Sequence, residues 1–136
     1  MDLNLDLDLD VDLVLDLDLK YLAWHKPSKL EVYQTAVRFL PLATGMADRL
    51  PPRYTATADQ LRRAALSIPL NIAEESVKST GPDRRRFYTM AGGSAMECAV
   101  IIDACSALAL IEQPKAQEAD QLLLSIVRML SKMCRA

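Results

Sequence analysis

Clusters of basic side chains are the residues of this sequence most able to support a function. Arg84-Arg85-Arg86 form an unbroken run, Lys78 precedes it, and Arg62-Arg63 form a pair earlier in the chain. Adjacent guanidinium groups bind phosphates through charge and paired hydrogen bonds. The sequence therefore offers two interpretations of this charge, which are an anion or nucleic-acid contact and an ordinary solvated surface.

The pattern of other reactive residues does not favour catalysis or metal binding. His25 is the one histidine, and di-iron bundles require Glu-x-x-His pairs that Glu74 and Glu97 lack. The cysteines include no C-x-x-C, and the seven-residue spacing of Cys98 and Cys105 is typical of one buried helical face. We therefore expect reduced thiols, no metal, no cofactor and no enzymatic activity.

The net charge of −2 averages two unlike parts of the chain. Residues 1–19 alternate leucine with aspartate and hold seven of the 18 acidic residues. Without residues 1–20 the chain has 15 basic and 11 acidic residues, a net charge of +4. Three interpretations of the repeat stay open: a low-complexity extension, an edge strand that pairs with copies of itself, and a calcium-binding repeat. We favour the first and divide the chain into a tail (1–20), a connector (21–27) and a helical body (28–134).

The sequence also bears on where the protein resides. It has no run of 18 uncharged apolar residues, so we expect no membrane-spanning helix. Its first residues lack the basic and unbroken apolar regions of a secretory signal. We therefore expect a cytoplasmic protein.

The body reads as four helices. Capping boxes at Ser28–Glu31 and Thr57–Gln60 predict two helix starts, and Pro41 and Pro69 are expected to kink rather than end those helices. The predicted helices cover about 28–50, 58–78, 84–109 and 114–133. Gly92-Gly93 falls inside the third helix, which favours close helix packing over a phosphate-binding loop.

Apolar residues recur on these helices at heptad spacing. The predicted seam of the third helix is Phe87, Ala91, Ser94, Cys98, Ile101, Cys105 and Leu108. The second helix carries one stripe through Leu61 and Ile68 and another through Leu66 and Leu70. We therefore predict an all-α, antiparallel up-down four-helix bundle, and the second stripe indicates a buried surface in a homo-oligomer.

Residues 30–110 resemble the bacterial four-helix bundle proteins first noticed as reading frames within 23S rRNA intervening sequences. The resemblance rests on LEVYQ at 30–34, QLRRAALSIPLNIAE at 60–74, Arg86-Phe87 and the stretch 91–97. It implies a cyclic oligomer, expected to be a pentamer. Related accessory proteins of diversity-generating retroelements look like basic barrels that bind nucleic acid and a reverse transcriptase.

The resemblance also assigns motif positions in this chain. They are Arg62, Arg63, Ser67, Asn71, Glu74, Arg86, Ser94 and Glu97. We expect Ser67 and Asn71 to bond between helices and Glu74 or Glu97 to pair with an arginine. Glu75 and Gly92 depart from the family pattern, which usually has glycine and arginine there, and both changes make the chain less basic.

Two hypotheses of function follow. The first is a non-enzymatic nucleic-acid or ribonucleoprotein accessory factor that contacts RNA or DNA through Arg62, Arg63, Lys78, Arg84, Arg85 and Arg86. The alternative is a protein-only oligomeric scaffold or adaptor that presents a surface to a partner protein. Binding that weakens steeply with salt distinguishes the first from the second.

Overall fold

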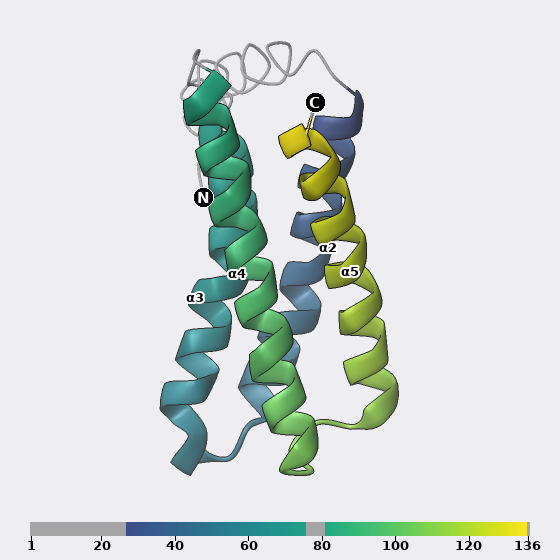
Figure 1. The fold of residues 1–136 in the computed structure, drawn as a ribbon. Coiled ribbons are helices and arrows are strands. Elements are labelled where there is room, and N and C mark those ends of the chain that lie inside the picture. Colours follow the sequence, from purple (N-terminus) through teal and green to yellow (C-terminus); the bar gives the residue numbers. More distant parts are fainter. Residues whose placement is uncertain (1–26, 76–80, 136) are drawn as a thin grey trace, which may run out of the picture.

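The computed structural model describes residues 27–75 and 81–135, which form helices joined by short links and include no strand (Figure 1). Its helices are α2 (Pro27–Arg49), α3 (Thr55–Glu75), α4 (Gly81–Ala107) and α5 (Gln113–Arg135), with a short 3₁₀ turn, η1, at Pro52–Tyr54. The predicted all-helical fold with four long helices is confirmed. The tail 1–20, most of the connector 21–27, His25, Val77 and Lys78 lie outside the described residues.

Each helix packs on the helix before it, and α5 also packs on α2. In Figure 1 the start of α2, the end of α3, the start of α4 and the end of α5 lie at one end of the molecule. Two ion pairs agree with this placement, because Lys29 contacts Glu75 at that end and Asp48 contacts Arg62 near the other. We call the first of these the upper end and the second the lower end.

The core is built from one repeated spacing. On every helix, four buried apolar residues follow one another at intervals of four, three and four, which keeps them on one helical face. They are Val32, Ala36, Phe39 and Ala43 on α2; Leu61, Ala65, Ile68 and Ile72 on α3; Ala91, Ala95, Cys98 and Ile102 on α4; and Ala119, Leu123, Ile126 and Leu130 on α5. Many are alanines, which let the helix axes approach closely.

The seam predicted for α4 is only partly correct. Ala91, Cys98 and Cys105 are buried as predicted, but Ala95 and Ile102 are fully buried in place of Ser94 and Ile101. Leu108 lies beyond the end of the helix and is 55% exposed. The face of α4 that turns inward is therefore rotated by about one residue from the heptad pattern.

Three helix starts also differ from prediction. α2 begins at Pro27, so Ser28 lies in its first turn, where proline's fixed φ suits the helix. α3 begins at Thr55 directly after η1, and the Thr55 hydroxyl donates to the Pro52 carbonyl at 2.6 Å. α4 begins at Gly81, which places Pro82 and Asp83 inside it. Helices α2 and α3 continue through Pro41 and Pro69, as expected.

α4 is an unusually apolar helix. Among the described helices it alone is long and apolar enough to cross a membrane, with a mean hydropathy of 1.2 over an 18-residue window, 28% of which is buried. The expectation of no membrane-spanning helix stays a prediction, because the core helix of a soluble protein passes the same test of length and composition. The exposed apolar side chains of α4 include Met90, Met96 and Val100, which the other described residues leave uncovered.

Candidate nucleic-acid interface

The arginine run lies at the upper end, in the first two turns of α4. Arg84, Arg85 and Arg86 are all exposed. The Arg84 Nε atom is 4.0 Å from a Glu75 carboxylate oxygen, and the Arg86 guanidinium lies over the Phe87 ring at 5.7 Å. Basic side chains near a helix N-terminus oppose the helix dipole, so this run is not explained by helix stability.

The end of α5 adds basic residues that the sequence analysis did not include. Lys132 and Arg135 are exposed and flank Cys134, whose sulfur lies 3.9 Å from the Thr89 hydroxyl on α4. The last turn of α5 therefore adjoins the first turns of α4. The sequence does show basic residues in the last turn of this helix. Such residues are common there because they interact favourably with the helix dipole, so they did not indicate a binding surface. We call Arg84, Arg85, Arg86, Lys132 and Arg135 the basic end.

Arg62 and Arg63 lie apart from the basic end, near the lower end of the bundle. The Arg62 guanidinium pairs with Asp48 at 2.7 Å and with Asp59 at 3.0 Å, and the hydrogen bond that it donates to Asp48 raises the pKa of Arg62. Its charge is therefore balanced by two aspartates. Arg63 is exposed and donates to the Gln60 side chain at 3.1 Å. Of the predicted contact residues in the described part of the chain, only Arg84, Arg85 and Arg86 lie together.

The Glu75 carboxylate, which makes the chain less basic than the family pattern, lies inside the protein and not on its surface. Its side chain is 4% exposed and its Oε2 atom forms an ion pair with Lys29, whose side chain is 8% exposed. The pair joins α2 to α3 directly beneath Arg84. Glu75 is therefore a buried acidic group that lies next to Arg84 of the basic end.

The predicted structural motif residues hold α3 against α4. The Ser67 and Ser94 hydroxyls are hydrogen-bonded across the two helices, and the Gln60 amide donates to the Glu97 carboxylate. Asn71 differs from expectation because its amide donates within α3, to the Ser67 carbonyl at 2.8 Å. Glu97 pairs with an amide rather than an arginine. Glu74 is exposed and forms no ion pair with another described residue.

Comparison with protein families matches residues 28–132 to the 23S rRNA-intervening sequence protein. This match covers all four helices almost completely. The chain belongs to that family. A search of curated proteins found no relative that matches it.

The resemblance inferred from 30–34, 60–74 and 91–97 is therefore confirmed. The matched range begins at Ser28, so the Leu/Asp repeat lies outside the family region of this intervening-sequence protein. The basic run and the α3–α4 hydrogen bonds both lie within it. The family description names a genetic location and no activity.

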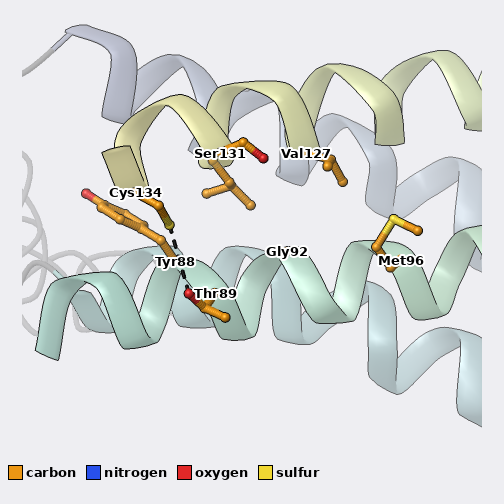
Figure 2. A pocket seen from close by; sticks show the side chains of 8 residues that line it. Tyr88, Thr89, Gly92, Met96, Val127, Ser131 and Cys134 are labelled. Carbon is orange, nitrogen blue, oxygen red and sulfur yellow. Dashed lines mark hydrogen bonds between the residues drawn. The ribbon is translucent and has the colours of Figure 1, made fainter. Parts of the chain in front are cut away.

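A groove separates α4 from α5 in this family member. Its volume is about 360 Å³, and Figure 2 shows Gly92 midway along it, with Tyr88 and Cys134 toward one end and Met96 toward the other. The lining residues are Tyr88, Thr89, Gly92 and Met96 on α4 and Val127, Leu130, Ser131 and Cys134 on α5. A Cβ atom at Gly92 or Gly93 would meet nothing within 4 Å. Close helix packing at the glycine pair is therefore a wrong prediction, and Gly92 instead widens the groove.

The cysteines differ in environment. Cys98 and Cys105 are free and buried, as predicted, while Cys134 is half-buried in the groove. Burial raises the pKa of the Cys98 thiol to about 12, and burial also raises the pKa of Cys105. The Cys98 thiol therefore stays protonated near neutral pH, so it is a poor nucleophile.

We predict that a thiol reagent modifies Cys134 of the native protein much faster than the other two cysteines. Cys134→Ala is expected to remove the fast phase, and unfolding is expected to make Cys98 and Cys105 reactive. The measurement is the time course of modification followed by mass spectrometry of peptides. Equal rates for all three cysteines in native protein would contradict the burial described here.

Proposed function

We propose that this protein is a non-enzymatic nucleic-acid accessory factor that binds RNA or DNA phosphates with the basic end. The observation that carries the proposal is the convergence of five exposed basic side chains from α4 and α5. Among the described residues, only Arg84 of the five has an acidic partner within 4.0 Å. Basic side chains without local partners are free to displace the counterions of a phosphate backbone.

We also propose that the chain is an up-down antiparallel bundle and that five copies of it assemble into a cyclic homo-oligomer. Val37, Leu66 and Leu70 are 38%, 49% and 58% exposed. The ion pair of Asp48 and Arg62 joins α2 to α3. Val37 lies three helical turns before Asp48 on α2, and Leu66 and Leu70 lie one and two turns after Arg62 on α3. The three apolar side chains therefore flank the same contact between α2 and α3. We call them the α2–α3 patch. An apolar patch of this kind is typical of a subunit contact. A ring of subunits would present one copy of the basic end from each subunit.

The nucleic-acid proposal is tested by salt-dependent binding of the full chain to fluorescent single-stranded RNA and DNA. We expect affinity to fall steeply with salt. Replacing Arg84, Arg85 and Arg86 by glutamine is expected to reduce the slope of log affinity against log salt by about 2, because three phosphate contacts are lost.

The matched control removes the same charge near the lower end, through glutamine at Arg49, Arg53 and Arg63. These three are also exposed, and the control is expected to keep most of the affinity. Equal losses in the two variants, or binding that ignores salt, would overturn the proposal. Absence of nucleic-acid binding together with a stable protein partner at high salt would support a scaffold instead.

The assembly is tested by mass measurement in solution. Leu66→Glu together with Leu70→Glu is expected to dissociate the oligomer, because each buries a charge in an apolar contact. Leu108→Glu, an equally exposed leucine beyond the end of α4, serves as the control and is expected to leave the mass unchanged. A monomeric wild-type protein would refute this part of the proposal.

A further inference from the structure

The α4–α5 groove continues into an exposed apolar strip. Met96, Val100 and Leu124 are 53%, 63% and 49% exposed. Val100 follows Met96 by one helical turn, and Leu124 lies seven residues before the lining residue Ser131, so all three extend the groove toward the lower end. The subunit contact proposed above uses the α2–α3 patch on other helices and leaves this strip without an occupant.

Arginines border the groove on both sides. Arg85 lies four residues before Thr89 and seven before Gly92, on the same face of α4. Arg128 and Arg135 stand seven apart on α5, at three residues before and four after Ser131. All three arginines are exposed and form no ion pair with another described residue. A segment with one apolar face and several acidic side chains would therefore complement the groove and its arginines.

The chain itself contains a segment with this pattern. Residues 3–19 have leucine or valine at all nine odd positions, and residues 2–18 have aspartate at seven of the nine even positions. In an extended conformation the odd and even side chains lie on opposite faces. One face of such a segment is apolar and the other carries seven negative charges.

The point of attachment lies at the correct end of the molecule. The segment joins the bundle at Pro27, and the start of α2 and the end of α5 are at the same end in Figure 1. Residues 20–26 span up to about 24 Å when extended. That reach exceeds the roughly 10 Å diameter of a helix such as α5. About ten extended residues then match the length of α5, since each adds about 3.3 Å.

We infer that residues 2–19 dock in the α4–α5 groove of their own or a neighbouring copy. The leucine face covers Gly92, Met96 and Leu124, and the aspartates lie against Arg85, Arg128 and Arg135. Docking does not depend on the proposed nucleic-acid binding. Where both occur they compete, because Arg85 and Arg135 belong to the basic end.

The experiment is disulfide trapping in the full chain, with the native Cys134 as the partner within the groove. Single cysteines replace Leu13, Leu15 or Leu17 in one set of variants and Asp12, Asp16 or Asp18 in the other. Under mild oxidation we expect the leucine set to form the disulfide with Cys134 about tenfold faster, which corresponds to about 1.4 kcal/mol of preference for one face. All six substitutions lie outside the bundle, so they leave its core unchanged.

A second pair of variants tests the groove itself. Gly92→Gln fills open space in the groove and is expected to reduce trapping by about tenfold, whereas Gly93→Gln, on the exposed neighbouring position, is expected to leave it unchanged. Both replace a helical glycine by a better helix former, so neither is expected to impair folding. High salt is expected to slow trapping, because it screens the aspartate–arginine attraction.

Several results would overturn the inference. Equal trapping of the leucine and aspartate sets would show that no face is selected, and an unchanged rate in Gly92→Gln would show that the groove is not the site. A rate of Cys134 modification that does not rise after deletion of residues 2–19 would show that this segment does not cover the groove. Nucleic-acid binding is measured separately, so its failure does not affect this outcome.

Discussion

Replacing Phe39 with alanine is expected to destabilise the protein by about 3–5 kcal/mol. Among the described residues Phe39 is the largest fully buried side chain, with an exposed fraction of 0%, and it lies in the 4-3-4 core series of α2. Its neighbours in that series include Ala36 and Ala43, which are too small to fill the space that the ring leaves. The loss of stability has two parts, which are the transfer free energy of the removed ring and the cost of the cavity that remains.

The measurement is urea unfolding followed by circular dichroism, at a fixed protein concentration because assembly adds to apparent stability. Leu108→Ala is the control. Leu108 is 55% exposed and outside α4, so we expect it to change the free energy of unfolding by no more than about 1 kcal/mol. A similar small loss for Phe39→Ala would mean that the core packs differently.

The second large effect is expected at the buried pair of Lys29 and Glu75. Lys29→Met removes the ammonium group and leaves the Glu75 carboxylate buried, with the Arg84 Nε atom at 4.0 Å and the Tyr88 side chain as its remaining polar neighbours. A buried charge that loses its partner typically costs about 3–5 kcal/mol. We expect a loss in this range, toward its lower end because Arg84 remains.

The double variant separates the pair from its surroundings. With methionine at both Lys29 and Glu75, no buried charge remains, and we expect stability to return to within about 1 kcal/mol of wild type. Breaking the exposed ion pair through Asp48→Ala is expected to cost far less, because water already screens it. A double variant as unstable as Lys29→Met would show that the pair contributes net stability. Urea unfolding of all three variants provides the comparison.

The helices themselves were predictable because periodicity is a local property of the sequence. Leu61 and Ile68 were expected on one face of α3, and both are fully buried. Helix ends were less predictable. The Ser28 and Thr57 capping boxes are short motifs, whereas the structure extends α2 to Pro27 and α3 to Thr55 beyond them.

The candidate interface was predicted in part. Arg84, Arg85 and Arg86 stood out because they are consecutive, and the structure places them on an exposed helix start. Lys132 and Arg135 were missed because their proximity to α4 arises from packing between segments far apart in the chain. Arg62 looked equally available, but Asp48 on another helix balances its charge.

Three features were decided by the tertiary structure alone. Ala95 and Ile102 replace Ser94 and Ile101 in the core, because both sets obey helical spacing and only the positions of α3 and α5 choose between them. Gly92 widens a groove instead of tightening a contact. Glu75 is buried against Lys29 because the end of α3 meets the start of α2.

The sequence by itself determined that the body of this protein is helical, that it has four long helices and that it belongs to the 23S rRNA-intervening sequence protein family. Those conclusions depend on spacing and motifs that each short stretch carries. The basic end, the α4–α5 groove and the buried Lys29–Glu75 pair depended on the tertiary structure. Each joins residues from two helices, and the contact between helices is set by how their surfaces pack, which no single helical stretch encodes.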